Sequence, residues 1–215
     1  IGAAVAIAFA REGADVAISY LEAEQVDAEH VRDVIEADGR TAVLIPGDIR
    51  DKGFCAELVE RAVEGLGGLD ILVNNAGNQV YAKALEDIED DEFDKTFQTN
   101  VYAMYWITKA ALPHLMPGAT IINTTSVQAY SPSPILLDYA ATKAAINAWS
   151  KGLAMQLAPR GIRVNAVAPG PIWTPLQVTE GQPPEKIEDF GTNTALGRAG
   201  QPVEVASAFV FLASP

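Results

Sequence analysis

Apolar residues recur along the chain with two different periods, and the two kinds of segment alternate. Short, nearly continuous apolar runs such as residues 69–74 are typical of buried strands. Longer segments with apolar residues three or four apart, such as 23–38, are typical of amphipathic helices. The pattern predicts strands at 15–19, 41–46, 69–74, 119–125 and 162–168, and helices at 3–12, 23–38, 53–65, 91–116, 139–158 and 203–213.

Buried strands that alternate with helices predict a parallel sheet covered by helices on both faces. We therefore expect an α/β, Rossmann-like, doubly wound fold of three layers (α/β/α). No repeat, charged block or linker indicates a second domain, so residues 1–215 are expected to form one domain. Residues 171–199 are rich in Pro, Gly and Thr and too long for a simple connection. They are predicted to be a substrate-binding loop.

Composition narrows the classes of partner. The 28 acidic residues outnumber the 15 basic ones, and a net charge of −13 argues against a nucleic-acid partner. No apolar run approaches the roughly 20 residues of a membrane span, and no leader is visible, so we expect no membrane partner. Cys55 is the only cysteine, which fits a cytoplasmic protein. Together with His30 and His114 it is too little for a histidine- or cysteine-rich metal site. No metal is therefore expected, although carboxylate sites stay open.

Small and polar residues follow four of the predicted strands. In an open parallel sheet, ligands bind beyond the carboxyl ends of the strands. These residues are therefore expected to line one edge of the sheet. They are Asp48, Asn74-Asn75-Ala76-Gly77, Ser126 and Pro169-Gly170.

Tyr139 and Lys143 lie four residues apart on a predicted helix, and such residues share one helix face. An ammonium group beside a phenol favours the phenolate and lowers the phenol pKa. A phenol of lowered pKa can pass a proton to or from a substrate oxygen. The hydroxyl of Ser126 is placed to bind that same oxygen. The pattern predicts a site that holds a carbonyl while another group delivers hydride.

The motifs occur in one order along the chain: Asn74-Asn75-Ala76-Gly77, Asn100, Ser126, Tyr139-x-x-x-Lys143 and Pro169-Gly170. In this order and spacing they resemble the short-chain dehydrogenase/reductase family, in its one-domain branch, over essentially the whole chain. Within that family the chain looks closest to bacterial glucose/ribitol dehydrogenase-like members and NADP-dependent aldehyde reductases. Residues 17–21, 128–134 and 169–174 carry the likeness to this subgroup.

The family begins with a strand and a glycine-rich Thr-Gly-x-x-x-Gly-x-Gly turn, and it ends with a further strand. Here Ile1-Gly2 resembles the end of that turn. The resemblance therefore implies a portion of a longer protein that is missing the first strand and the C-terminal strand. The missing turn would cradle a pyrophosphate with backbone N–H groups.

The resemblance implies a role for each motif residue. Tyr139 is the general acid for carbonyl reduction and the general base for the reverse reaction. Lys143 lowers the pKa of Tyr139 and holds the nicotinamide ribose, and Ser126 stabilises charge on the substrate oxygen. Asn100 holds the long helix open and anchors a water. The implied cofactor contacts are Gly2, Asp48, Ile49, Asn75, Ala76, Gly77, Tyr139, Lys143, Pro169, Gly170, Ile172 and Thr174, and the implied substrate contacts are Gln128, Tyr130 and Trp173.

The residue that ends strand 15–19 bears on the choice of cofactor. Members specific for NAD carry an acid there, which binds the ribose 2′-hydroxyl. Here the position is Tyr20, and without an acid there is no repulsion against a 2′-phosphate. Glu22 is two residues further on and could still reach the ribose, and no nearby Arg supplies a positive partner. NADP(H) is favoured, and NAD(H) stays open.

The resulting hypothesis is an NAD(P)-dependent oxidoreductase that acts on a small aldehyde, ketone or sugar alcohol. A nucleotide-binding regulator or scaffold on the same fold is the alternative, and the intact Asn, Ser, Tyr and Lys set argues against it. A sugar-nucleotide epimerase usually carries a larger C-terminal substrate domain, for which this length leaves little room. The resemblance also implies a homotetramer assembled through helices 91–116 and 139–158, with Trp149, Leu153 and Leu157 on the outer face of the latter.

Overall fold

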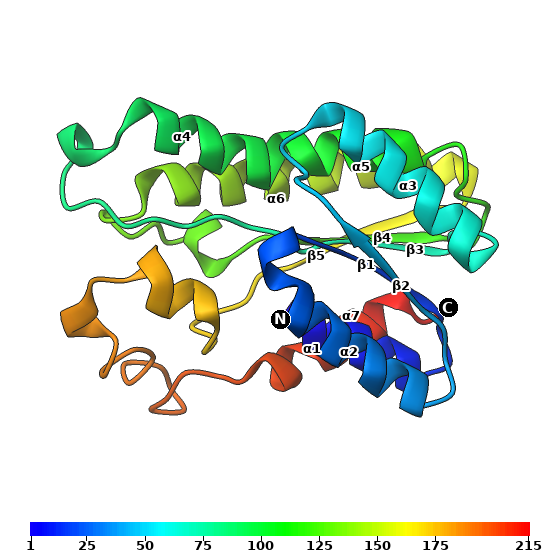
Figure 1. Cartoon of the computed structure of the whole chain (residues 1–215). Helices are drawn as coiled ribbons and strands as arrows, with labels where there is room; N and C mark the ends of the chain where they lie inside the picture. The colour runs from blue at the N-terminus through cyan, green and yellow to red at the C-terminus, as the bar shows by residue number, and fades with distance from the viewer.

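The computed structural model describes residues 1–215 apart from the side chain of Glu180. A layer of parallel strands lies between two layers of helices (Figure 1). The predicted α/β fold class is thereby confirmed. The strands are β1 (Val16–Tyr20), β2 (Ala42–Pro46), β3 (Ile71–Asn74), β4 (Thr120–Thr124) and β5 (Arg163–Val167). The helices are α1 (Gly2–Arg11), α2 (Gln25–Ala37) and α7 (Pro202–Ala213) on one face, and α3 (Lys52–Leu66), α4 (Asp90–Phe97), α5 (Ala103–Ala111) and α6 (Leu137–Leu157) on the other.

All strand pairs in the described chain are parallel: β1 pairs with β2, and β4 pairs with both β3 and β5. Successive β4 side chains point to opposite faces of the sheet. Ile121 therefore packs in the core under α3, α5 and α6, and Ile122 packs in the core formed with α1 and α7. Both side chains are fully buried, so each face of β4 lies in an apolar core. This arrangement fixes the position of the residues that follow the strand.

Helix α3 begins where the sequence predicts. The carboxylate of Asp51 accepts hydrogen bonds from the backbone N–H groups of Gly53 at 2.6 Å and Phe54 at 3.4 Å, which would otherwise lack partners. The helix ends at Gly67, whose φ of 77° lies in the left-handed region that glycine adopts without strain.

The single helix expected at 91–116 is wrong in two respects. A π-helical turn, Gln98–Tyr102, separates α4 from α5. It contains Asn100, whose amide bonds to the backbone of Asn78 on a distant segment. Such turns widen a helix and occur often at functional sites. Helix α5 also ends at Ala111, two residues before Pro113, because proline disfavours helical geometry in the residue that precedes it.

The loop 171–199 is closed at its base by backbone hydrogen bonds. The N–H of Trp173 donates to the oxygen of Gly200 at 2.8 Å, and the N–H of Gly200 donates to the oxygen of Pro171 at 2.9 Å. Between these points the chain forms short turns, including Gln177–Gly181 and Pro184–Lys186. In the part of the chain that the structure describes, none of the helices has the length and apolar character needed to cross a membrane.

Candidate active site

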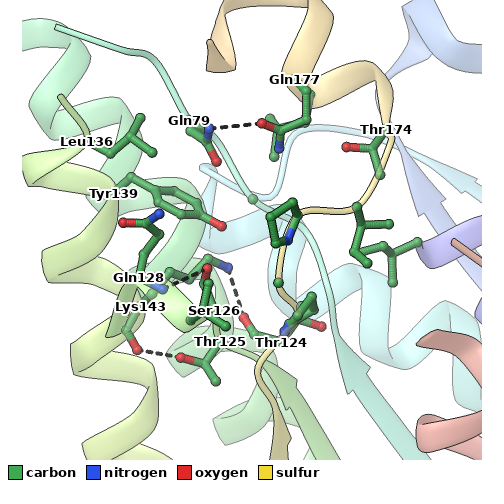
Figure 2. A pocket seen from close by; sticks show the side chains of 18 of the residues that line it. Gln79, Thr124, Thr125, Ser126, Gln128, Leu136, Tyr139, Lys143, Thr174 and Gln177 are labelled. Atoms are coloured by element: carbon green, nitrogen blue, oxygen red, sulfur yellow. Dashed lines mark hydrogen bonds between the residues drawn. The ribbon is translucent and has the colours of Figure 1, made fainter. Parts of the chain in front are cut away.

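A cavity of about 280 Å³ lies beyond the carboxyl ends of β3, β4 and β5. The 171–199 loop forms its other wall (Figure 2). The residues that follow the three strands thus meet around one space, as the sheet topology predicts. Those of the predicted site residues that line it are Asn75, Gly77, Ser126, Gln128, Tyr139, Lys143, Pro169, Gly170, Ile172 and Thr174.

Tyr139 and Ser126 meet at the centre of the cavity. Tyr139 lies in the first turn of α6, and Ser126 follows β4 within two residues. Their hydroxyl groups point toward each other in Figure 2. Ser126 also accepts a hydrogen bond from the N–H of Gln128 at 3.2 Å, which fixes its side chain. A substrate oxygen placed here has two hydroxyl groups available to it.

Lys143 lies one helical turn from Tyr139 and is fully buried. Its Nζ lies 5.4 Å from the centroid of the Tyr139 ring and donates a hydrogen bond to the backbone oxygen of Thr124 at 2.8 Å. Its own carbonyl accepts a hydrogen bond from the hydroxyl of Thr125 at 2.7 Å. The side chain and backbone of Lys143 are therefore both tied to the end of β4.

Burial has the largest effect on the pKa values of both Tyr139 and Lys143. It raises the pKa of Tyr139, and the neighbouring hydroxyl of Ser126 lowers that pKa by less. Burial also lowers the pKa of Lys143 to about 8. The expectation that Lys143 lowers the pKa of Tyr139 stays a prediction. The lysine lies over the ring and donates to the backbone oxygen of Thr124, and not to the Tyr139 hydroxyl.

Asn100 is buried in the π-helical turn, and both ends of its side-chain amide form hydrogen bonds. Its Oδ1 accepts from the N–H of Asn78 at 2.6 Å, and its Nδ2 donates to the oxygen of Asn78 at 2.9 Å and to the hydroxyl of Thr142 at 3.0 Å. A Cβ at Gly77 would lie 3.6 Å from Lys143 Nζ and 3.7 Å from Asn100 Oδ1. Gly77 thus borders both side chains and keeps the space between them open.

The N-terminus of α1 forms a second wall that fits a dinucleotide. A Cβ at Gly2 would lie 2.9 Å from Nδ2 of Asn75, so any larger residue here would displace the Asn75 amide. Asn75 accepts a hydrogen bond from the hydroxyl of Thr124 at 3.3 Å, which holds it at the strand ends. A helix N-terminus with unpaired N–H groups beside a glycine suits the pyrophosphate of a nucleotide. Lys143, buried in the cavity below it, adds a hydrogen-bond donor.

The comparisons with known proteins identify the family of this chain. The family model described as "Enoyl-(Acyl carrier protein) reductase" matches residues 1–215. The chain is 59% identical to the uncharacterized oxidoreductase YhxD of Bacillus subtilis over 217 residues, which is 100% of this chain and 73% of that protein. The chain belongs to the short-chain dehydrogenase/reductase family.

One further relative and one solved structure show which other short-chain dehydrogenase/reductases the chain is similar to. The chain is 44% identical to the NADPH-dependent aldehyde reductase 1, chloroplastic, of Arabidopsis thaliana, over 99% of this chain and 75% of that protein. A crystal structure of a short chain dehydrogenase from Burkholderia cenocepacia J2315 in complex with NADP superposes with a TM-score of 0.91. It is 38% identical, covering 100% of this chain and 86% of that one. The protein is thus an NAD(P)-dependent oxidoreductase of this family.

Three of the residues expected to contact the cofactor lie outside the cavity of this short-chain dehydrogenase/reductase: Asp48, Ile49 and Ala76. Asp48 follows β2, and its carboxylate is held by the guanidinium of Arg50 at 2.5 Å, which lowers the pKa of Asp48. Ile49 packs against the core between β1, β2 and α3, and Ala76 is exposed at the end of β3. Tyr20 ends β1 and donates its hydroxyl to Oε1 of Gln25 at 2.5 Å.

Two of the three residues predicted to contact substrate do not line the cavity. Tyr130 is 64% exposed and donates its hydroxyl to Asn147 at 3.1 Å. Trp173 is 41% exposed, and its ring packs against Phe190 at 6.3 Å between centroids. Phe190 takes the place at the cavity wall that the sequence assigned to Trp173. Gln128 does line the cavity, and its Oε1 accepts from the N–H of Ser133 at 2.6 Å.

Sequence reasoning missed a group of cavity residues from the loop and from the segment after β3. One signal was available: Gln79 comes directly after the Asn-Asn-Ala-Gly-Asn run that follows a predicted strand. The others lie where no periodic pattern shows the direction of a side chain. The missed residues are Gln79, Leu136, Gln177, Gln182 and Phe190.

Proposed function

We propose that the protein interconverts a small neutral aldehyde or ketone and its alcohol, with Tyr139 as the proton donor and acceptor. The observation that carries this proposal is the meeting of the Tyr139 and Ser126 hydroxyls with the buried Lys143 at one cavity. Among the described lining residues, Lys143 is the one charged side chain. A highly charged substrate would therefore find no counter-charge beyond the catalytic lysine.

Each residue then has one task. The Ser126 hydroxyl binds the substrate oxygen, and Tyr139 donates a proton to that oxygen during reduction and removes it during oxidation. The ammonium of Lys143 stabilises the phenolate that Tyr139 becomes after it has given its proton. Asn100 holds the backbone at Asn78 and so keeps the cavity floor in place. The nicotinamide nucleotide supplies or accepts the hydride.

The residues proposed to hold the phosphates of that nucleotide lie around the N-terminus of α1. Gly2 and Gly77 leave room for close approach, and Asn75 and Lys143 supply hydrogen-bond donors. Asp48 and Ile49 would bind the adenine end at the edge of β2. NADP(H) is favoured over NAD(H), because β1 ends in Tyr20 and not in an acid, and because relatives named above use or bind NADP. The remaining proposed contacts are Ala76, Pro169, Gly170, Ile172 and Thr174.

We also propose that the protein is a cytoplasmic homotetramer. Helices α4 to α6 carry an aromatic surface in which Tyr102 and Tyr105 are partly exposed, and Tyr105 meets Trp149 edge to face at 5.7 Å between centroids. Exposed aromatic surface of this kind suits a contact between subunits. Leu153 and Leu157 are buried inside the monomer, so they are not part of that surface. Light scattering after size-exclusion chromatography measures the assembly directly.

The decisive experiment follows absorbance at 340 nm with NADPH and with NADH against a panel of aldehydes, ketones and sugars. Loss of a general acid lowers turnover by about 10² to 10⁴-fold, which is the loss expected for Tyr139→Phe. The matched control is Tyr130→Phe, since Tyr130 lies outside the cavity. Equal activity of wild type and Tyr139→Phe would contradict the proposed mechanism. Nucleotide binding without turnover would favour a regulatory or scaffold protein.

A further inference from the structure

Gln79 occupies a distinct place in the cavity wall. It follows the Asn-Asn-Ala-Gly-Asn run after β3, and only 4% of its surface is exposed. In Figure 2 the Tyr139 hydroxyl lies between Gln79 on one side and Ser126 on the other. No role in the proton transfer requires an amide at this position. Buried polar side chains are normally hydrogen-bonded, so the partners of this amide indicate what it does.

The contacts of Gln79 determine which way its amide is turned. One end of the amide lies 2.7 Å from the backbone oxygen of Gly181, on the 171–199 loop. A carbonyl oxygen can only accept, so this end must be Nε2 and the other must be Oε1. Nε2 also lies 3.5 Å from Oε1 of Gln177. The orientation is therefore set by the loop and not by the cavity.

The amide oxygen of Gln79 is left on the cavity side. Figure 2 shows it directed toward the Tyr139 hydroxyl. It accepts no hydrogen bond from a described residue, and it is not among the buried side-chain atoms left without a partner, so it reaches the open space of the cavity. It is an acceptor beside the place where a substrate carbon would react, and a substrate hydroxyl is the neutral group that satisfies it.

Other neutral amides line the same cavity. Gln182 donates to Oε1 of Gln177 at 3.4 Å, and the same oxygen lies 3.5 Å from Nε2 of Gln79, so Gln177 links the other two. Gln128 also lines the cavity. A site whose polar groups must bind hydroxyls rejects an analogue without them, because its buried polar atoms then stay unpaired. Such a lining suits hydroxylated substrates better than plain alkyl ones.

We propose that Gln79 is a specificity-determining residue: its Nε2 holds the 171–199 loop over the cavity, and its Oε1 accepts a hydrogen bond from a substrate hydroxyl on the carbon next to the reacting one. The preferred substrates are then neutral α-hydroxy aldehydes and ketones and the corresponding vicinal diols. This inference rests on the proposed function. It adds the substrate class and the residue that selects it.

The test compares substrates that differ only by hydroxyl against methyl. Glycolaldehyde is compared with propanal, and hydroxyacetone with butanone, using kcat/KM of the full-length protein from NADPH consumption. One hydrogen bond contributes about a tenfold preference, so wild type should favour the hydroxylated member of each pair by about tenfold. Gln79→Leu should bring the ratio close to one. Gln156→Leu is the matched control, since Gln156 is exposed on α6.

Further variants separate the two roles of Gln79. Gln79→Glu keeps an acceptor oxygen but cannot donate to Gly181, so the hydroxyl preference should remain while limited proteolysis cuts the 171–199 loop faster. Gln79→Met keeps the length of the side chain without its polar amide. It should also bring the hydroxyl-to-methyl ratio of kcat/KM close to one, so it replaces Gln79→Leu if that variant fails to fold. Circular dichroism and NADPH fluorescence establish that each variant is folded and binds nucleotide.

The outcomes distinguish this inference from the proposed function. A wild type that turns over both members equally, or prefers propanal, overturns the role of Gln79 and leaves the oxidoreductase function standing. An equal fall with both members in Gln79→Leu also overturns it, because it assigns Gln79 to loop packing alone. No turnover with any substrate overturns both proposals.

Discussion

Asn100 and Asn78 are joined by two hydrogen bonds that run in opposite directions. The N–H of Asn78 donates to Oδ1 of Asn100, and Nδ2 of Asn100 donates to the oxygen of Asn78. The pair links the π-helical turn to the segment that carries Gly77 and Gln79. The floor of the cavity therefore depends on one buried amide.

Asn100→Asp should destabilise the protein more than its small change in shape suggests. The carboxylate can still accept from Asn78, but its second oxygen meets the Asn78 carbonyl and loses the donor to Thr142. Leaving buried groups unpaired costs about 1–3 kcal/mol. Urea denaturation measures the change, with the exposed Asn193→Asp as the control. Equal midpoints for the two variants would show that the Asn78 contacts do not stabilise the fold.

The buried Lys143 should make stability rise with pH. Its pKa falls from 10.5 to about 8 on folding, so between these values the unfolded chain binds more protons than the folded one. The cost of burying the charge is fully present below pH 8 and disappears as pH rises toward 10.5. At about 1.4 kcal/mol per pKa unit, the change is on the order of 3 kcal/mol.

The test measures the free energy of unfolding of wild type and of Lys143→Met by urea denaturation at pH 7, 8, 9 and 10. The methionine variant should be the more stable one at pH 7, and its advantage should shrink by pH 10. A difference that stays constant with pH would mean that Lys143 is not desolvated in the folded protein.

Gly47→Ala should be costly for steric reasons. Gly47 ends the β2 segment with a φ of 157°, and a Cβ there would meet the ring of Phe54 at 2.2 Å. Gly13, with a φ of 99° and open space around it, is the matched comparison, since alanine there meets only backbone strain of about 1–2 kcal/mol. Thermal melts should place Gly47→Ala well below Gly13→Ala. Similar melting temperatures would indicate that Phe54 moves aside at little cost.

Cys55 should be unreactive in the folded protein. It is fully buried in α3, and burial raises the pKa of its thiol to about 11, so little thiolate forms near neutral pH. Its Sγ also lies 3.0 Å from the oxygen of Ile49. Reaction with a disulfide reagent at pH 8 should be slow in the native state and complete in guanidinium chloride. Fast modification of native protein would reveal frequent local opening at α3.

Much of the fold is predictable because burial on both faces leaves a readable pattern. Strands such as β2 are short apolar runs, and the Asp51 cap at the start of α3 depends only on residues next to it in sequence. Tyr139, Ser126 and Lys143 converge because each is placed by the end of β4 or by the first turns of α6. The roles assigned to them remain predictions.

The rest depends on contacts between residues far apart in sequence. The π-helical turn at Gln98–Tyr102 goes with the hydrogen bonds between Asn100 and Asn78, and no local sequence pattern predicts those bonds. The direction of Tyr130 and Trp173 is set by Asn147 and Phe190. The end of α5, by contrast, had a visible signal in the proline at position 113.

The two hydrogen bonds at the base of the 171–199 loop make it a replaceable unit. The loop leaves and rejoins the protein at one point, where Pro171 and Trp173 both meet Gly200. Its length and sequence can therefore change without altering the pairing of β3, β4 and β5. Selection can act on substrate range through this loop while the proton-transfer residues stay fixed on the sheet. Replacing this loop with that of a relative should therefore change the substrate range and leave the proton-transfer residues in place.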